Sequence, residues 1–503
     1  MEQPGAGGDE RVFAGSVEHK LILDMKLYNR HFFLFLSLLA LSLGQSYAQD
    51  QRPNILVILC DDLGYSDVGF NGSQDIKTPT LDLLASQGTI MTSGYVAHPF
   101  CGPSRAAFMT GRYPHEYGAQ FNLPPNSETI GKGIPLEETF ISKVLQQSGY
   151  YTGIVGKWHL GANPEFHPNE RGFDDFYGFL GGGHNYHPEE YEPRYKAQKE
   201  KGVEVIWDYL KPLEHNGVDI YPKEYLTDAL SNHARVFVKE AARKDKPFFL
   251  YLSYNAPHVP LEAKEEDLAL FSSIKDEDRK TYAAMVYAVD RGVKDLIATL
   301  KETGEYENTL ILFLSDNGGN LEHGATNFPL QEGKGSTHEG GYRVPMFFHW
   351  PGHIAEGELF DHPVSAIDFY PTFAALAQQA LPQGKKIDGK NIWGDLMSGK
   401  NPHQNDMIYT LRHWEGYTDI GARKDEWKAL KSGEKWELFN IVLDKSEVYD
   451  LSKLYPEKLK EMVKEVEEWS QSNAEPQWFT PLELEEIWKD KNMATFNDTF
   501  KIK

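Results

Sequence analysis

Four apolar runs, each followed at once by charged or polar residues, constrain the fold of this chain more than any other feature of its sequence. They span residues 55–60, 151–155, 248–254 and 310–314. Runs of this length, bounded by polar residues, are typical of buried strands. Helical patterns lie between them, for example at 136–147 and 282–300. This alternation predicts an α/β fold with a large, mostly parallel sheet flanked by helices on both faces.

Polar side chains follow each of the four predicted strands. They are Asp61 and Asp62, Lys157 and His159, His258, and Asp316 and Asn317. In open α/β sheets, ligands bind outside the carboxyl ends of the strands. A loop start or a helix cap would explain any one of these groups alone. Together they predict a single site at that edge of the sheet.

The composition changes after about residue 400. Short β-like segments with turn residues are followed by an amphipathic helical pattern at 456–472. We therefore expect a catalytic domain over 49–400 and a smaller C-terminal α+β domain with an antiparallel sheet over 401–503. A chain of 503 residues is long enough for both.

The N-terminal region resembles a targeting segment. Lys26 and Arg30 precede an apolar run at 32–43, and Ser46-Tyr47-Ala48 resembles a cleavage site. The run is too short to span a membrane comfortably. We interpret 1–24 as an upstream extension and 25–48 as a signal peptide. The mature protein is then expected to be periplasmic or secreted, without a membrane span.

Charge and cysteine content narrow the function. The formal net charge of −23 argues against nucleic acid as a partner, because such binding requires a basic surface. An anionic substrate would need local cations to overcome this field. The chain has two cysteines. Cys60 ends an apolar run and is expected to be a small buried hydrophobic residue, which leaves Cys101 to explain.

The segment "CGPSRAAFMTGR", which begins at Cys101, has the features of a helix start. Pro103 is tolerated in a first turn and Gly111 can end a helix. Cys101 would then lie at the N-terminal end, where backbone N–H groups favour anions. Arg105 would project from the same face one turn later. This combination suits a tetrahedral oxyanion.

The same segment matches the signature C-x-P-S-R-x-x-x-[LM]-T-G-R of type I sulfatases at every fixed position. "LCDDLG", "GKWHLG", "NAPHVP", "SDNGG" and "GKGSTHEGGYRVP" extend the resemblance over nearly the whole mature chain. The chain thus resembles the formylglycine-dependent sulfatases of the alkaline-phosphatase-like superfamily, most of all polysaccharide sulfatases of marine bacteria. The resemblance implies that Cys101 is oxidised to Cα-formylglycine by a formylglycine-generating maturation enzyme.

The resemblance also implies roles for the strand-end residues. Asp61, Asp62, Asp316 and Asn317, with residue 101, correspond to oxygen ligands of a divalent cation, for which Ca²⁺ is expected and Mg²⁺ is the alternative. Arg105, Lys157 and Lys334 correspond to sulfate-binding cations. His159 corresponds to the histidine beside the formylglycine hydrate. His258 corresponds to the residue that protonates the departing alcohol.

The expected substrate is a sulfated carbohydrate, with algal ulvan, carrageenan or fucan as candidates. The Gly-, His- and Tyr-rich segment 181–195 suggests a sugar contact from His184, with an ordinary surface loop as the alternative. Arg412 and His413 follow a β-like run, in the domain that contributes to the substrate pocket of related sulfatases.

Three other functions remain open from the sequence. The chain could be a phosphodiesterase or phosphonate hydrolase of the same superfamily. It could bind sulfated glycans without turnover, although it keeps every acidic residue that the family uses. It could also be a secreted thiol enzyme with unmodified Cys101.

Overall fold

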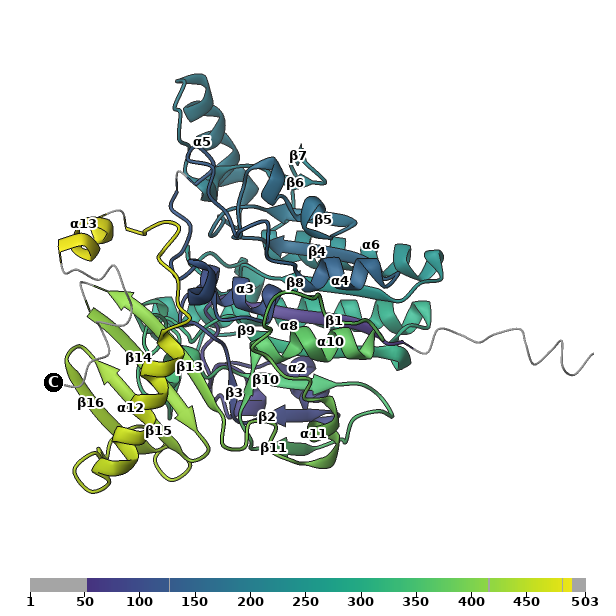
Figure 1. Cartoon of the computed structure of the whole chain (residues 1–503). Coiled ribbons are helices and arrows are strands. Elements are labelled where there is room, and N and C mark those ends of the chain that lie inside the picture. Colours follow the sequence, from purple (N-terminus) through teal and green to yellow (C-terminus); the bar gives the residue numbers. More distant parts are fainter. Residues whose placement is uncertain (1–51, 126, 415–416, 482, 491–503) are drawn as a thin grey trace, which may run out of the picture. The chain divides into compact units, whose positions relative to one another are not determined.

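A ten-stranded mixed sheet forms the centre of the fold in this computed structural model (Figure 1). The structure describes residues 52–125, 127–414, 417–481 and 483–490. The predicted extension at 1–24 and signal peptide at 25–48 lie outside these residues. From Arg52 onward the chain clusters into one compact unit.

The four predicted strands lie side by side in this sheet, in the order β9 (Thr309–Ser315), β1 (Asn54–Cys60), β8 (Phe248–Ser253) and β4 (Tyr151–Lys157). All four are parallel, and β5 (Asp175–Phe179) continues the parallel run. Both faces of the sheet are covered at these strands, which explains why the strands are almost continuously apolar. The predicted mostly parallel α/β sheet is therefore confirmed at its centre.

The flanking strands make the sheet mixed. β6 (Leu213–His215) and β7 (Val218–Ile220) extend it antiparallel beyond β5. On the other side β10 (Met346–His349) pairs antiparallel with both β9 and β2 (Thr89–Met91), and β11 (Glu358–Phe360) pairs parallel with β2. A separate pair is formed by β3 (Gly94–Tyr95) and β12 (Val364–Ser365).

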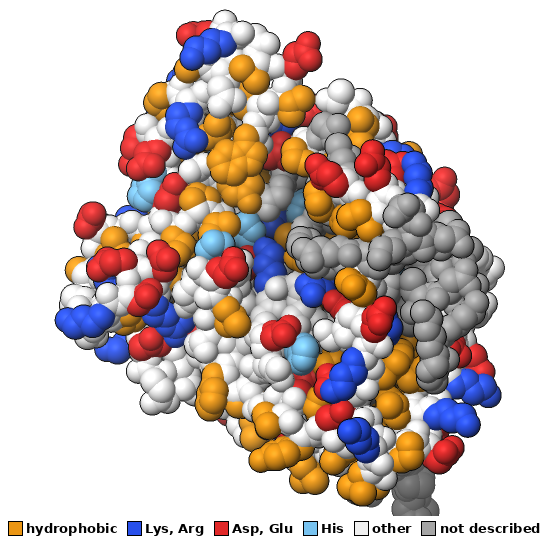
Figure 2. Space-filling view, turned by 90° about the vertical axis from the view of Figure 1, so that its left-hand side faces the viewer, with side chains coloured by type: hydrophobic (Ala, Val, Ile, Leu, Met, Phe, Trp, Pro, Cys, Tyr) orange, Lys and Arg blue, Asp and Glu red, His pale blue; other side chains and the backbone are white. Residues whose placement is uncertain are grey.

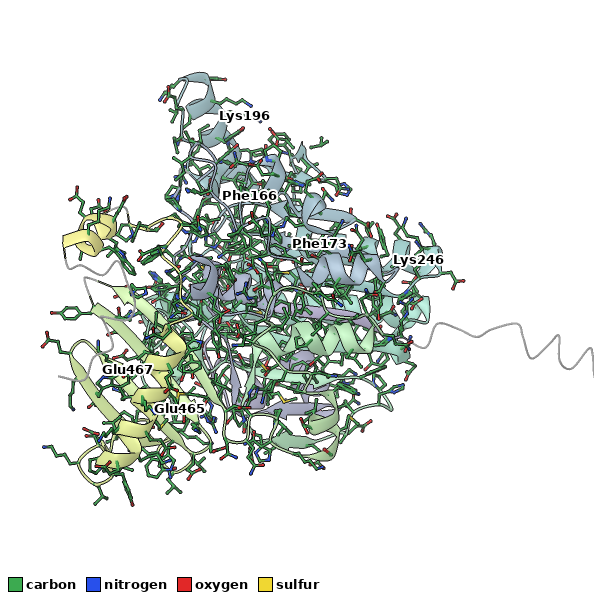
Figure 3. The ribbon with its side chains drawn as sticks, in the orientation of Figure 1. Phe166, Phe173, Lys196, Lys246, Glu465 and Glu467 are labelled. Atoms are coloured by element: carbon green, nitrogen blue, oxygen red, sulfur yellow. The ribbon has the colours of Figure 1, made fainter. Side chains whose placement is uncertain are left out.

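Helices cover both faces of the sheet, as predicted. Ile55, Val57 and Leu59 of β1 share one core cluster with residues of α3 (Cys101–Thr110), α4 (Ile141–Gln147) and α10 (Phe369–Leu376). Leu56, Ile58 and Cys60 point the other way, toward α2 (Pro79–Ser86), α6 (Leu226–Lys244) and α8 (Glu277–Thr303). Cys60 is thus the buried hydrophobic residue that was expected. In Figure 3, Phe173 lies in the interior and Lys196 of α5 (Pro188–Glu200) lies at the surface.

One predicted helix is shorter than expected. The pattern at 282–300 lies within α8, but the pattern at 136–147 becomes helical only at Ile141. The Arg171 guanidinium donates hydrogen bonds to the backbone carbonyls of Ile134, Pro135 and Glu138. Those carbonyls are therefore held in a turn, and the prediction is wrong for residues 136–140.

The C-terminal part contains the predicted antiparallel sheet. Its strands are β13 (Met407–Trp414), β14 (Tyr417–Lys424), β15 (Trp427–Ser432) and β16 (Lys435–Asn440). α12 (Pro456–Ser470) packs on β14 and β15, and α13 (Glu483–Asp490) follows. The Nε2 atom of His115, in η2 (Pro114–Tyr117), lies 3.1 Å from the carbonyl of Leu411 in β13, which connects this sheet to the segment after α3. A domain boundary at residue 400 stays a prediction.

The remaining helices are short. They are α7 (Glu265–Ala269), α9 (Glu339–Tyr342), α11 (Trp393–Ser398) and the 3-10 turns η1 (Gly69–Asn71), η2 (Pro114–Tyr117), η3 (Pro164–Phe166), η4 (Pro168–Arg171), η5 (Asp208–Leu210), η6 (Tyr306–Asn308), η7 (Leu321–His323) and η8 (Ala366–Asp368). Across the described residues, no helix combines the length and apolarity that crossing a membrane requires.

Candidate active site

The polar residues that follow the central strands meet at one edge of the sheet, because β9, β1, β8 and β4 are neighbours. The Lys157 Nζ atom lies 2.5 Å from Asp61 Oδ2. The Lys334 Nζ atom lies 2.8 Å from Asp62 Oδ2, and Asn317 Nδ2 donates to Asp62 Oδ1 over 2.7 Å. The predicted gathering of strand-end residues is therefore present in the structure.

Cys101 enters this group from the first turn of α3, as its sequence predicts. The helix starts at Cys101 and ends at Thr110. It is capped by Gly111, whose φ of 66° lies in the left-handed region that glycine adopts readily. The Cys101 sulfur and one carboxylate oxygen each from Asp61 and Asp316 lie within 4.8 Å of one another. The modification candidate and the acidic cluster thus share one site.

Arg105 lies inside the acidic cluster, with its side chain 1% exposed. Its Nε atom donates to Asp316 Oδ2 over 2.8 Å, and Nη2 lies 2.7 Å from the same oxygen. Nη1 donates to the Ser253 hydroxyl and to the Lys157 carbonyl. A planar guanidinium held on so many acceptors fixes the orientation of Asp316. Binding of sulfate by Arg105 stays a prediction.

Two buried oxygens in this cluster, Asp61 Oδ1 and Asn317 Oδ1, have no hydrogen-bond partner among the residues that the structure describes. Buried polar atoms in native proteins are nearly always hydrogen-bonded, so such atoms require an explanation. A Ca²⁺ ion takes six to eight hard oxygen ligands from carboxylates and amides. The three carboxylates and the amide collected here fit that preference, and a cation would satisfy both spare oxygens.

The acidic residues respond differently to burial. Burial opposes the charge of Asp61, but the surrounding cations, led by Lys157, outweigh it and hold its pKa well below the usual range. Burial and the Asp61 carboxylate raise the pKa of Asp316 to about 7, although Arg105 opposes the shift. Two carboxylates this close cannot both ionise easily without a further positive charge. This electrostatic conflict is what a bound cation would resolve.

The unmodified Cys101 thiol is poorly suited to act as a nucleophile. Burial raises its pKa above the usual value, and the opposing effect of Lys157 and Lys334 does not reverse the shift. A reactive cysteine requires a lowered pKa and some exposure. The geometry therefore disfavours the thiol enzyme that the sequence left open.

His159 faces the N-terminal turn of α3. A methyl group on Gly102 would lie 3.5 Å from His159 Cε1. Within the described part of the chain, the buried Nδ1 atom of His159 has no hydrogen-bond partner. Burial, reinforced by Lys157, holds the pKa of His159 well below its usual range. Its φ of 61°, like the 64° of Asp62, is a left-handed value that is rare outside glycine and concentrated at functional sites.

His258 lies beside Asp62 of the acidic cluster. Its Nε2 atom is 3.7 Å from Asp62 Oδ2, and its Nδ1 atom lies 2.7 Å from the Val259 carbonyl. Burial lowers the pKa of His258 to about 4, although Asp61 opposes the shift. Both histidines are therefore neutral near pH 7 in this arrangement.

Asn122 is part of the site but was missed from the sequence. Its Oδ1 atom accepts a hydrogen bond from the Gly102 N–H over 2.9 Å and lies 3.8 Å from the Cys101 sulfur. No sequence motif points to Asn122, because only the tertiary fold brings its loop to the start of α3. It holds the backbone beside residue 101.

The three predicted substrate contacts have different surroundings. His184 is fully buried, and its ring nitrogens face the carbonyls of Asn185 and Lys211 at 2.6 and 2.8 Å, which favours a structural role over a sugar contact. Arg412 and His413 border a cavity of about 150 Å³ that Asn122 also lines. Arg412 donates to Asp419 over 3.1 Å, and His413 Nδ1 lies 2.9 Å from the Thr418 hydroxyl. Their contact with substrate stays a prediction.

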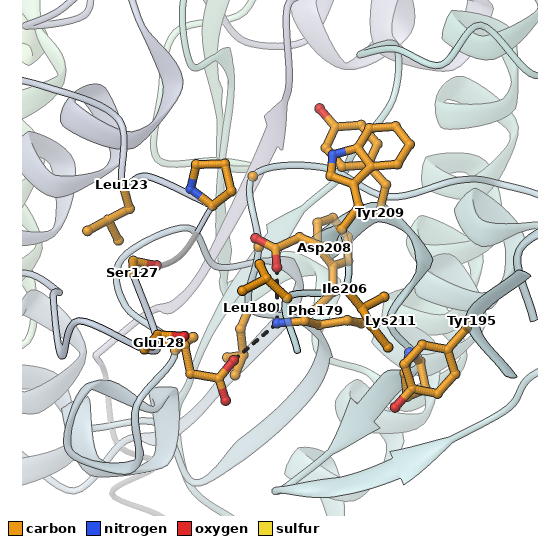
Figure 4. Close-up of a pocket in the computed structure, with 18 of the residues that line it drawn as sticks. Leu123, Ser127, Glu128, Phe179, Leu180, Tyr195, Ile206, Asp208, Tyr209 and Lys211 are labelled. Atoms are coloured by element: carbon orange, nitrogen blue, oxygen red, sulfur yellow. Dashed lines mark hydrogen bonds and ion pairs between the residues drawn. The ribbon is translucent and has the colours of Figure 1, made fainter. Parts of the chain in front are cut away.

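A larger cleft of about 510 Å³ has His159 among its lining residues. Figure 4 shows other residues that line it, among them Glu128, Asp208 and Lys211. Its walls come largely from the segments 123–125, 127–129 and 203–212. Lys211 bridges them, with its Nζ atom 3.1 Å from both Glu128 and Asp208. In the space-filling view, histidine and basic side chains lie in a hollow with hydrophobic side chains at its rim (Figure 2). The site is thus open to a ligand larger than sulfate.

Comparison with known families matches most of the chain. Residues 53–379 match the family model described as Sulfatase. Residues 333–475 match the model described as N-sulphoglucosamine sulphohydrolase, C-terminal. Human N-acetylgalactosamine-6-sulfatase is 35% identical over 411 residues, which cover 78% of this chain and 74% of that protein.

Solved structures give a similar result. The crystal structure of Ps i-CgsB in complex with k-i-k-neocarrahexaose is 55% identical, with a TM-score of 0.88, and the match covers 90% of this chain and all of that one. PsFucS1 sulfatase from Pseudoalteromonas sp. is 28% identical with a TM-score of 0.71, over 84% of this chain and 91% of that one. The similarity therefore includes both the large sheet and the C-terminal one.

Proposed function

This chain belongs to the sulfatase family, whose members are sulfuric ester hydrolases, and from this premise we propose that it removes sulfate from a sulfated carbohydrate of the carrageenan type. The observation that carries the proposal is the acidic cluster with spare oxygens built around Cys101. The 55% identity to a structure that contains a neocarrahexaose favours carrageenan over the other algal candidates, fucan and ulvan.

The proposed nucleophile comes from residue 101. Oxidation of Cys101 to formylglycine by a maturation enzyme would supply a hydroxyl group in its hydrated form. A bound Ca²⁺, or Mg²⁺ as the alternative, held by Asp61, Asp62, Asp316 and Asn317, would neutralise charge on the sulfuryl oxygens. Asn122 and Arg105 keep residue 101 and the acidic residues in place, which lowers the cost of orienting the reacting groups.

Lys157 and Lys334 stabilise the sulfate ester. Each pairs with a carboxylate at the inner end of the site, so that positive charge is fixed before substrate arrives. Preorganised charge in a site that excludes water is usually the largest contribution to catalysis. These cations also offset the repulsion that a protein of net charge −23 exerts on an anionic substrate.

The two histidines move protons. His159 is neutral and its Nδ1 atom is unpartnered, so it can accept a proton from the hydroxyl at residue 101. His258 must carry a proton to donate it to the departing sugar oxygen. The negative charge of the sulfate ester would raise its pKa from about 4 toward the working range.

Residue 101 and substrate turnover can be tested together. We expect peptide mass spectrometry across 100–112 to show an aldehyde after co-expression with a formylglycine-generating enzyme. The same preparation should release sulfate from carrageenan oligosaccharides, and Cys101→Ala should not. A free thiol at residue 101 in an active preparation would overturn the proposal that formylglycine supplies the nucleophile. Faster turnover of an aryl phosphate than of an aryl sulfate would favour the phosphodiesterase alternative.

Export is a separate proposal. The signal-like segment at 25–48 supports a periplasmic or secreted location, which would give the enzyme access to polysaccharide outside the cell. N-terminal sequencing of the secreted fraction should find a mature chain that starts near Gln49. Retention of the protein in the cytoplasm with an intact N-terminus would contradict the proposed export.

A further inference from the structure

An exposed aromatic pair lines the cleft outside the sulfate-binding end. Trp207 is 47% exposed, and its ring stacks on that of Tyr209 with a centroid distance of 4.2 Å and an interplanar angle of 12°. Large aromatic side chains usually bury their faces. Here the outer face of the stack is left to solvent, on the wall of a cleft that begins at His159.

The pair is anchored to the catalytic end of the cleft. The Tyr209 ring centroid lies 6.2 Å from that of His258. Behind Tyr209, a methyl group on Gly183 would come within 2.4 Å of the ring, so the backbone approaches it as closely as only glycine permits. The aromatic surface is therefore fixed in position relative to the proton donor proposed for the leaving sugar oxygen.

The charged residues around the pair do not favour a second sulfate. Glu128 and Asp208 share one cation, Lys211, with both separations 3.1 Å. Lys199 also lines the cleft, but Glu204, Glu214 and Asp219 add further acidic side chains, so that acidic residues outnumber the lysines. Sulfate-binding lysines instead lie at the inner end, with Asp61 and Asp62. The outer cleft therefore combines an aromatic face with hydrogen-bonding groups, which suits an uncharged ring with hydroxyls.

We propose that Trp207 stacks on a sugar ring of the polysaccharide chain next to the residue that loses its sulfate. This inference rests on the proposed function and deepens it: the cleft binds a segment of the chain as well as the ester. Trp207 is then a specificity-determining residue, and Tyr209 is the support that holds its ring in place.

Kinetics with two substrates test the proposal. For Trp207→Ala, kcat/KM on a carrageenan hexasaccharide should fall roughly tenfold, mostly through KM, because one stacking contact is lost. Turnover of a small aryl sulfate, which reaches only the inner end, should stay within about twofold, the scatter of a small surface change. Trp207→Phe should recover most of the activity on the hexasaccharide. Tyr449→Ala, an exposed aromatic residue outside the cleft, is the matched control.

Several results would overturn the proposed stacking of Trp207 on a sugar ring. Unchanged kcat/KM of Trp207→Ala on the hexasaccharide would show that no ring stacks there. An equal loss on both substrates would show that Trp207 acts by positioning Tyr209 and His258. If wild-type protein does not turn over the aryl sulfate, the inhibition constant of inorganic sulfate reports on the inner end and should not change.

Direct binding separates this inference from the proposed function. Calorimetric titration of wild-type protein and Trp207→Ala with the hexasaccharide does not depend on turnover. Weaker binding by the variant, with no sulfate release by either protein, would contradict the proposed enzymatic function but support the stacking of Trp207 on a sugar ring. Equal binding by both proteins would contradict the stacking of Trp207 on a sugar ring, whatever their sulfatase activity.

Discussion

Two buried clusters of charged residues in this protein have opposite constructions. The active-site cluster contains Asp61, Asp62 and Asp316 with Lys157, Lys334 and Arg105.

The junction cluster contains Glu339, Arg343, Arg423, Lys428 and Glu447, and joins α9 to the C-terminal sheet. Lys428 Nζ lies 3.1 Å from Glu339 and 2.7 Å from Glu447. Arg343 pairs with Glu339, and Arg423 donates to the Tyr95 hydroxyl, which itself donates to Glu339.

The difference between them lies in what is left unsatisfied. In the junction cluster, both Glu339 oxygens have cationic or hydroxyl partners, and Glu447 Oε2 accepts the Glu339 N–H. Glu447 Oε1 accepts no hydrogen bond from the described residues, but it is ion-paired with Lys428 Nζ at 2.7 Å. In the active-site cluster, Asp61 Oδ1 and Asn317 Oδ1 have no hydrogen-bond partner among the residues that the structure describes. Buried carboxylates that are ion-paired hold elements together, whereas buried oxygens without any partner carry a free-energy cost that a bound ligand would remove.

The largest expected effect is on stability, at the junction. Lys428→Met would leave two buried carboxylates without their shared cation. We expect the free energy of unfolding to fall by about 3–5 kcal/mol, the usual cost of breaking a buried ion pair. Chemical denaturation followed by circular dichroism would measure it. The folded fraction should keep its kcat/KM. A loss of activity per folded molecule with unchanged stability would contradict the contrast between the clusters.

The matching change at the active site should affect catalysis instead. Lys334→Ala removes a preorganised cation next to Asp62, and we expect kcat/KM for sulfate release to fall on the order of 10²–10³-fold. Its denaturation midpoint should stay much closer to wild type than that of Lys428→Met. Lys196→Ala, an exposed lysine on α5, is the control and should change neither property. A fall in stability as large as that at the junction would mean that both clusters serve the same purpose.

Removal of calcium should distinguish the clusters by thermal stability, without an activity assay. At a free Ca²⁺ concentration about 100 times Kd, binding adds about 2.7 kcal/mol to the free energy of unfolding. Chelation should therefore lower Tm in wild type and, by a similar stability change, in Lys428→Met. Asp316→Asn should show little response to Ca²⁺. A full response in Asp316→Asn would place the ion elsewhere.

The smallest expected effect is an acid-dependent loss of stability. Burial opposes the charge of Glu339, but Lys428, Arg343 and Arg423 outweigh it and lower its pKa to about 2. A lowered folded-state pKa contributes stability that is fully present above about pH 4.5 and is lost as pH falls toward 2. Burial raises the pKa of Glu447 and opposes this trend, so a net change of about 1–2 kcal/mol is expected.

Unfolding measured from pH 6 to pH 2 would test this acid dependence. Glu339→Gln should show a flatter loss of stability below about pH 4.5 than wild type, because it cannot gain the proton. Glu457→Gln, on the exposed side of α12, should follow the wild-type curve. Parallel curves for Glu339→Gln and wild type would exclude Glu339 as the source of the pH dependence.

Much of the architecture was predictable because it depends on local patterns. The four apolar runs became adjacent parallel strands, and Pro103 and Gly111 bracket the helix that carries Cys101. Prediction failed at 136–140, where Arg171 binds the carbonyls of Pro135 and Glu138, which a helix starting at residue 136 would use as hydrogen-bond acceptors. It was also incomplete for Arg105, whose partner Asp316 lies 211 residues away in the chain.

The amino-acid sequence by itself determined which residues could do chemistry. Residue types, strand ends and the segment that starts at Cys101 are properties of short stretches, and short stretches set local conformation and the available functional groups. Only the tertiary structure decided which distant atoms meet. The hydrogen bond from Gly102 to Asn122, the spare oxygens of Asp61 and Asn317, and the exposed Trp207 face all result from long-range packing. No local pattern specifies such packing, because it depends on how all the elements share one core.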